Sequence, residues 1–243
     1  GVAAFVVAAE RFVAAHPGHT GTLDPLATGL LPLCFGAATK FSQLHLDADK
    51  TYETTVRLGV TTTTADAEGE VVARSNPEGL TRETLEQVLP LFLGAIRQVP
   101  PMYSALKHQG QRLYELAREG VEVERAPREV TIHALKLTTF GTGEFEIDVR
   151  CSKGTYIRTL AEDIAAAVGQ CAHLAGLRRL EVSPFRAEMV TWDELERSAA
   201  GGDSALDACL LDAAVAVGDW PQVRLDSDRA YFMAHGQAVR VAG

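Results

Sequence analysis

One stretch of twelve residues, from Gly18 to Gly29, constrains this chain more than any other. It reads Gly-His-Thr-Gly-Thr-Leu-Asp-Pro-Leu-Ala-Thr-Gly. Gly18 and Gly21 permit backbone conformations that other residues avoid, and Pro25 disfavours the helical region for Asp24 and pushes it toward an extended backbone. Such a loop holds a carboxylate rigidly above a scaffold, as a catalytic nucleophile requires. The sequence therefore indicates Asp24 as a candidate nucleophile.

Two simpler interpretations of this segment stay open. A phosphate-binding loop of the Walker type would require Gly-Lys-Ser or Gly-Lys-Thr at a set spacing, and neither tripeptide occurs in the chain. An ordinary surface turn would use the Asp24 side chain only to accept a hydrogen bond from its own backbone. The rest of the chain has to decide between that turn and a catalytic loop.

Length and composition bound the class of protein. With 243 residues, 47% of them hydrophobic, the chain can bury a core and supports one large or two modest domains. No run of eighteen apolar residues occurs, so no membrane span is predicted. The apolar segment 2–15 is interrupted by Glu10 and Arg11 and lacks a positively charged leader, which argues against a signal peptide. The four cysteines never form a C-x-x-C pair, a pattern typical of free thiols in a reducing cytoplasm.

The net charge of −9 argues against a broad nucleic-acid-binding surface, because phosphate contacts come from Lys and Arg. The charge is unevenly distributed. Residues 181–243 contain eleven acidic and five basic residues, so most of the negative excess lies in the last quarter. Lys153, Arg158, Arg178 and Arg179 gather near a second motif, which is compatible with a local basic face on an acidic protein.

Predicted helices and strands are mixed without a regular βαβ order, which favours an α+β fold over a doubly wound sheet. Residue alternation predicts strands over 30–35, 51–58, 130–140, 145–151 and 174–182. Helical patterns cover 2–15, 37–46, 85–93 with Thr81 as N-cap, 113–118 and 157–168. The polar segment 61–69 is predicted to be an exposed loop, and 221–242 to form the opening strands of a second domain.

The second motif, Ser152-Lys153-Gly154-Thr155-Tyr156-Ile157-Arg158, lies between a predicted strand and a predicted helix. Thr155 is suited to cap that helix, which would place Tyr156 and Arg158 in its first turn, facing a ligand. The alternative is an ordinary turn with a solvated arginine.

These motifs resemble those of the TruB family of tRNA pseudouridine synthases. The family's G-H-T-G-T-L-D-P segment matches residues 18–25, and its K-G-T-Y-I-R segment matches residues 153–158. Its K-x-Y, Q-x-P-P-x-Y-S-A-x-K and L-R-R segments match residues 50–52, 98–107 and 177–179, in the same order. The resemblance extends over nearly the whole chain, from about residue 8 to residue 240.

The resemblance implies three catalytic residues. Asp24 corresponds to the family's nucleophile, Arg158 to the arginine that pairs with it, and Tyr52 to the tyrosine that stacks on the base near its C5 position. It also implies a set of substrate-binding residues, namely His19, Asp66, Lys153, Tyr156 and Leu177. Without the resemblance, Tyr52 and Leu177 would be read as core residues, and Asp66 as a solvated residue of an acidic loop.

The implied reaction converts the T-loop uridine of tRNA, position 55, to pseudouridine. The C1′–N1 bond breaks, the base turns over, and C1′ joins C5. No oxidation and no external group transfer occur, so we expect no cofactor and no metal, and the chain has no G-x-G-x-x-G, H-E-x-x-H or G-x-S-x-G motif. The uridine must leave its stack to be reached. Whether Asp24 adds to the substrate or deprotonates C2′ stays open.

The resemblance also implies the pseudouridine synthase fold, with a central mixed, mostly antiparallel sheet flanked by helices, and a domain organisation. We expect a catalytic domain over residues 1–218 and the start of a PUA-like RNA-binding domain over 219–243. Family members begin with a strand carrying K-P-x-G-x-[ST]-S, which this sequence lacks, so we expect that strand to be missing. We further expect a cytoplasmic monomer that binds the T-stem loop of tRNA and no membrane. Two alternatives remain, an RNA-binding or tRNA-folding module with secondary catalysis and a guide-dependent synthase acting on ribosomal RNA.

Overall fold

The computed structural model describes residues 3–8, 18–19, 21, 23–104, 106–186 and 189–240. A ten-stranded sheet forms its centre. In chain order the strands of this sheet are β1 (Ala3–Ala8), β2 (Gly18–His19), β3 (Ala27–Cys34), β4 (Lys50–Leu58), β7 (Gly94–Gln98), β10 (Arg128–Gly141), β11 (Glu144–Cys151), β12 (Ala172–Val182), β13 (Phe185–Arg186) and β14 (Leu211–Asp212).

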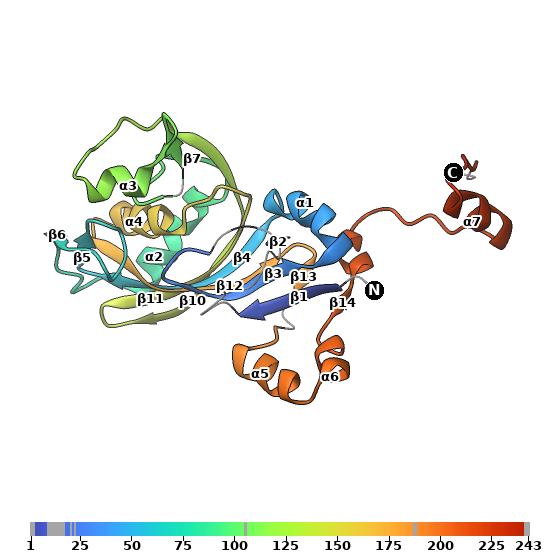
Figure 1. Cartoon of the computed structure of the whole chain (residues 1–243). Helices are drawn as coiled ribbons and strands as arrows, with labels where there is room; N and C mark the ends of the chain where they lie inside the picture. Colours follow the sequence, from blue (N-terminus) through green and yellow to red (C-terminus); the bar gives the residue numbers. More distant parts are fainter. Residues whose placement is uncertain are drawn as a thin grey trace.

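The strands follow the spatial order β14-β1-β3-β12-β4-β11-β10-β7, with β2 paired to β3 and β13 to β12 (Figure 1). Neighbouring strands are antiparallel, except that β3 and β12 run parallel. Two hairpins stand outside this sheet and are formed by β5 (Val60–Thr62) with β6 (Val71–Arg74) and by β8 (Lys107–His108) with β9 (Gln111–Arg112).

The helices are short and irregularly interspersed, which confirms the predicted α+β class. They are α1 (Ser42–Leu46), α2 (Arg82–Val88), α3 (Leu113–Arg118), α4 (Ile157–Ala167), α5 (Trp192–Ala200), α6 (Asp203–Asp207) and α7 (Ser227–Ala234), with 3-10 turns η1 (Gly36–Phe41), η2 (Leu89–Phe92) and η3 (Ala213–Val217). Among the described residues, none of these helices has the length and apolar character needed to cross a bilayer.

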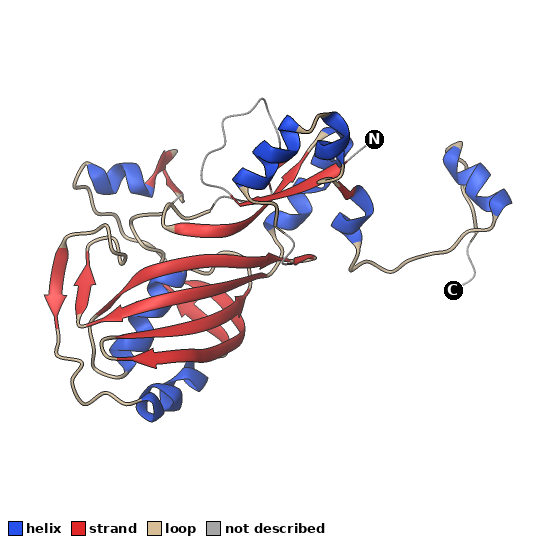
Figure 2. Ribbon diagram, turned by 90° about the horizontal axis from the view of Figure 1, so that it is seen from below, coloured by secondary structure: helices blue, strands red, loops and turns tan. Residues whose placement is uncertain are grey.

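The main core lies between the central strands and one helical layer. Helix α4 presents Leu160, Ala161 and Ile164 at helical spacing, and all three are fully buried. The facing strand β11 alternates, with Phe145 and Ile147 pointing into the same cluster. Figure 2 shows helices on the face of the sheet behind the strands. This packing fixes the start of α4 relative to β4, β11 and β12.

The contact between β3 and β12 depends on a glycine. Gly29 has φ +96°, and a Cβ at this position would collide with the backbone carbonyl oxygen of Arg179 on β12. Only glycine combines that backbone conformation with so close an approach. The twelve-residue motif therefore ends where its strand joins the sheet, which places the Asp24 loop at the start of β3 beside β12.

The N-terminal prediction is wrong where the structure describes the segment. The sequence predicts a helix over 2–15, whereas Ala3–Ala8 forms β1, which pairs with β3 and β14. A short apolar run fits a buried strand or a helix equally well by periodicity, and here the tertiary partner β3 decides. Residues 9–17 lie outside the described part of the chain.

Two further predictions differ from the structure. Within 221–240 the described residues contain no strand but the helix α7, whose N-cap Asp226 accepts a hydrogen bond from the Arg229 N–H. Figure 1 shows α7 apart from the body of the protein, at the end of an extended linker. The predicted exposed loop 61–69 begins inside β5, and Thr62, Ala65 and Asp66 are buried. The burial of Asp66 bears on the candidate active site.

Candidate active site

Asp24 lies in a tight turn immediately before β3. Its Oδ1 accepts a hydrogen bond from the Leu26 N–H at 3.0 Å, and its carbonyl oxygen accepts one from the Ala27 N–H at 2.8 Å. The turn expected by the simpler interpretation is therefore present. The Asp24 side chain nevertheless remains 28% exposed, so the turn presents a carboxylate whose backbone is fixed and whose side chain is accessible.

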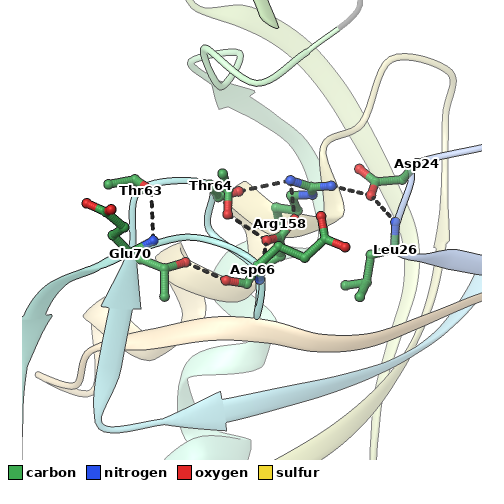
Figure 3. A network of polar contacts seen from close by, with 9 residues as sticks. Asp24, Leu26, Thr63, Thr64, Asp66, Glu70 and Arg158 are labelled. Carbon is green, nitrogen blue, oxygen red and sulfur yellow. Dashed lines mark hydrogen bonds and ion pairs between the residues drawn. The ribbon is translucent and has the colours of Figure 1, made fainter. Parts of the chain in front are cut away.

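Arg158, in the first turn of α4, connects this carboxylate to a second one. Its Nη2 pairs with Asp24 Oδ1, while its Nη1 pairs with Asp66 Oδ2 and donates to the Thr64 carbonyl at 3.0 Å. The side chain is only 8% exposed. In Figure 3 the guanidinium lies between the two aspartates. A solvated arginine is therefore excluded.

Asp66 belongs to the loop between β5 and β6 and is the most buried member of this network, at 2% side-chain exposure. Its Oδ1 accepts hydrogen bonds from the Thr64 hydroxyl and, at 2.9 Å, from the Glu68 N–H. The loop is attached to β12 because the Ala67 N–H donates to the Leu174 carbonyl at 3.1 Å. A buried charge needs a partner, so Asp66 is a counterion of Arg158 and not a solvated loop residue.

Tyr52 lies on β4 and Leu177 lies on the neighbouring strand β12. Leu177 is 7% exposed and lies opposite Ala27 of β3 and Thr54 of β4. Tyr52 packs against the same hydrophobic cluster. Burial raises the pKa of Tyr52, the positive charge of Arg179 lowers it, and the negative charge of Asp24 adds only a minor rise.

Tyr156 is positioned by the side-chain amide of Gln98, a role that the sequence does not indicate. The Gln98 side chain is 1% exposed, accepts from the Tyr156 N–H at 3.0 Å and donates to the Tyr156 carbonyl at 3.2 Å. Tyr156 is itself the N-cap of α4, without a side-chain cap. The predicted cap Thr155 instead donates its hydroxyl to the Ser152 carbonyl at 2.9 Å, because the turn before the helix satisfies it locally.

Of the remaining predicted residues, Lys153 lies outside this network. Lys153 forms an exposed ion pair with Asp47, with 2.8 Å between Nζ and Oδ1. The backbone of His19 belongs to β2, but its side chain lies outside the described residues. In the part of the chain that the structure describes, no cluster of His, Cys, Asp and Glu suited to a metal is found.

The burial of Arg179 also differs from the prediction. The sequence predicts that Arg179 belongs to a local basic face, whereas the residue is 2% exposed and its Nε donates to the Leu30 carbonyl at 2.8 Å. Alternation along 174–182 was the available signal, because Leu177 and Arg179 share a face and Leu177 is apolar. Its neighbour Arg178 is exposed.

Comparisons with known proteins agree with this geometry. Residues 10–157 match the family model described as TruB family pseudouridylate synthase (N terminal domain), and residues 158–217 match that of the tRNA pseudouridylate synthase B C-terminal domain. The tRNA pseudouridine synthase B of Stutzerimonas stutzeri is 57% identical over 225 residues, covering 92% of this chain and 73% of the relative. The Nitrosococcus oceani protein of the same name is 53% identical over 96% of this chain and 76% of its own length.

A solved structure shares the fold. The crystal structure of a Cbf5-Nop10-Gar1 complex contains a chain that superposes with a TM-score of 0.72 at 23% sequence identity, covering 96% of this chain and 67% of that one. At this identity the similarity concerns the fold alone.

Proposed function

Because the chain belongs to the TruB family of pseudouridylate synthases, we propose that it isomerises a tRNA uridine to pseudouridine with Asp24 as nucleophile. One observation carries the assignment. Arg158 engages Asp24 through a single carboxylate oxygen, Oδ1, and the Asp24 side chain remains 28% exposed. That is the arrangement of a positioned nucleophile rather than of a structural ion pair.

The residues around Asp24 supply the requirements of the reaction. Asp24 attacks the substrate or removes the C2′ proton, and the C1′–N1 bond breaks. The base turns over and C1′ joins C5, and with this the bond to Asp24 breaks or the proton returns to C2′, so that Asp24 is regenerated. The C5 proton then leaves, and Tyr52 is the candidate group to assist. Arg158 keeps the carboxylate in place during these steps because Asp66 fixes the guanidinium from its other side.

We assign the T-loop uridine, position 55 in the T-stem loop of tRNA, as the target. Single-stranded loops with splayed bases are the usual targets of sequence-specific RNA recognition, and a flipped base needs apolar and aromatic surfaces to replace its stacking. Tyr52, Tyr156 and Leu177 provide such surfaces, and His19 and Lys153 are proposed to contact the neighbouring nucleotides. No step of this reaction requires a cofactor or a metal.

The division of the chain and its location belong to the same proposal. We assign catalysis to residues 1–218, which contain the whole Asp24–Arg158–Asp66 network, and an RNA-binding role to residues 219–243, where α7 stands apart. A tRNA-modifying enzyme with four free cysteines fits the reducing cytoplasm. We propose that it acts there as a monomer.

A reaction with purified components tests the assignment. The protein is incubated with an unmodified tRNA transcript, without guide RNA or other proteins, and pseudouridine is mapped by mass spectrometry. We expect one pseudouridine, in the T loop, and none in a control transcript whose T-loop uridine is replaced by cytidine. A folded protein that binds the transcript but forms no pseudouridine would instead support the RNA-binding or guide-dependent alternative.

A further inference from the structure

Gln98 is the last residue of β7, the strand at one edge of the central sheet. Its backbone pairs with Arg128 on β10, and the residue is only 1% exposed. A buried side-chain amide carries donors and an acceptor that are costly to leave unpaired. The partners of this amide therefore indicate what Gln98 does.

Both ends of the Gln98 amide contact the backbone of one residue. Oε1 accepts from the Tyr156 N–H at 3.0 Å, and Nε2 donates to the Tyr156 carbonyl at 3.2 Å. Tyr156 has extended backbone angles, φ −97° and ψ 105°. The side-chain amide thus pairs with it as a residue of a neighbouring antiparallel strand would. Two contacts to the same residue fix both its position and its orientation relative to β7.

This residue is the N-cap of α4, two positions before Arg158. Its carbonyl also accepts the first hydrogen bond of the helix, from the Leu160 N–H at 3.0 Å. At the other end of the turn, the Ser152 N–H donates to the Thr131 carbonyl at 2.8 Å, and the Ser152 hydroxyl accepts from the Thr131 N–H at 2.9 Å. The turn from β11 to α4 is therefore held at both ends, and Gln98 holds the end nearer to Arg158.

We propose that Gln98 is a positioning residue, which sets Arg158 against Asp24 through the start of α4. The inference rests on the proposed function for the reaction that this ion pair serves. Arg158 contacts Asp24 with one nitrogen and Asp66 with the other. A small displacement of the first turn of α4 would disturb these simultaneous contacts and with them the orientation of the nucleophile. Because Gln98 is buried, its replacement should change the rate and not the affinity for tRNA.

A double-mutant cycle tests the dependence on Arg158. The single-turnover rate of pseudouridine formation at saturating tRNA is measured for Gln98→Met, Arg158→Lys and the double variant. We expect Gln98→Met to slow the reaction at least about tenfold when Arg158 is present and less than about twofold in the Arg158→Lys background. The Kd for tRNA should stay within about twofold of wild type. Equal losses of rate in both backgrounds would overturn the proposal. Gln87→Met, at an exposed position of α2, is the matched control and should leave the rate unchanged.

Rescue by a carboxyl group separates the two hydrogen bonds from packing alone. A protonated carboxyl offers one donor and one acceptor in nearly the shape of the glutamine amide, and burial favours the protonated form. At about pH 5.5, Gln98→Glu should therefore recover most of the rate that Gln98→Met loses, with each variant compared with wild type at the same pH. A Gln98→Glu rate no higher than that of Gln98→Met would contradict the proposal.

A spectroscopic readout keeps the proposal testable if Gln98→Met folds poorly or if the reaction itself is misassigned. The protein is labelled with ¹⁵N-arginine, and Arg158→Lys identifies the Arg158 signals. Gln98→Asn is the milder variant, because it keeps the amide but shortens the side chain by one methylene. We expect it to shift the Arg158 Nη signals and to merge them as the guanidinium becomes free to rotate. Unchanged Arg158 signals would contradict the proposal whether or not the protein isomerises uridine. Absence of pseudouridine formation by folded wild-type protein would contradict the proposed function alone.

Discussion

Arg158 shows how one side chain organises this site at the scale of residues. Its guanidinium contacts Asp24 with one nitrogen and Asp66 with the other, while the Thr64 carbonyl accepts from the same side as Asp66. The planar fork of arginine makes these contacts simultaneously, which a lysine ammonium on a flexible stem does not. The orientation of Asp24 therefore depends on a residue 134 positions later in the chain.

Replacing this fork should reduce the rate more than substrate binding. For Arg158→Lys we expect a fall in the single-turnover rate of pseudouridine formation of about a hundredfold, because the carboxylate loses its fixed orientation. The Kd for tRNA should change little, since Arg158 is buried. Arg82→Lys, in an exposed pair with Glu86 on α2, serves as the control. An unimpaired Arg158→Lys rate would show that the ion pair does not orient the nucleophile.

A second residue-scale prediction concerns pH. Burial, reinforced by the neighbouring Asp163, raises the pKa of Glu162 on α4 from 4.5 to about 7. The folded protein thus retains a proton that the unfolded chain releases near pH 4.5, and the free energy of unfolding falls as pH rises from there to about 7. Glu162→Gln removes this loss, so above pH 7 the variant should be more stable than wild type by about 1 kcal/mol, allowing for partial exposure.

Denaturant unfolding at pH 4 and pH 8 checks this prediction. The two proteins should have similar stabilities at pH 4, where Glu162 is protonated in both states, and differ at pH 8. A variant that is less stable than wild type at pH 8 would contradict the assigned direction of the pKa.

At the scale of elements, local patterns predicted the strands and helices whose own residues decide their structure. β11 and α4 were found within two residues because Phe145, Ile147 and Val149 alternate and Leu160 and Ile164 recur at helical spacing. β1 was missed because its pairing with β3 is a long-range interaction. Asp66 was left undecided for the same kind of reason, since the cation that makes its burial favourable lies on α4. The family motif predicted the pairing of Asp24 with Arg158, whereas composition alone did not.

A substitution at Gly29 tests how much the close approach of β3 to β12 contributes to stability. Gly29→Ala introduces a Cβ that collides with the β12 backbone at Arg179, in addition to the strain of a positive φ. Gly79→Ala is the matched control, because Gly79 has φ +86° but no neighbouring atom within 4 Å of the added Cβ. We expect the control to lose about 1 kcal/mol and Gly29→Ala to lose about 3 kcal/mol or more in chemical denaturation. Equal losses would mean that the close approach of β3 to β12 contributes nothing.

At the scale of the whole molecule, an overall charge of −9 coexists with a substrate that is a polyanion. Most of the acidic excess lies in the last quarter of the chain, where α5 and α6 stand on the side of the sheet away from α4 (Figure 1). Two arginines near the site do not contribute to a basic surface. Arg158 and Arg179 are buried and donate hydrogen bonds to protein carbonyl groups. Recognition by the shape of a flipped loop agrees better with this distribution than recognition through a broad basic surface.

The most direct measurement compares wild type with Asp24→Asn for pseudouridine formation and for tRNA binding in parallel. The asparagine retains the size of the side chain and an oxygen that accepts from the Leu26 N–H, but it loses the anionic nucleophile. The account predicts loss of pseudouridine formation by about a thousandfold or more with a Kd within about twofold of wild type. Isomerisation by Asp24→Asn at a rate near that of wild type would contradict it.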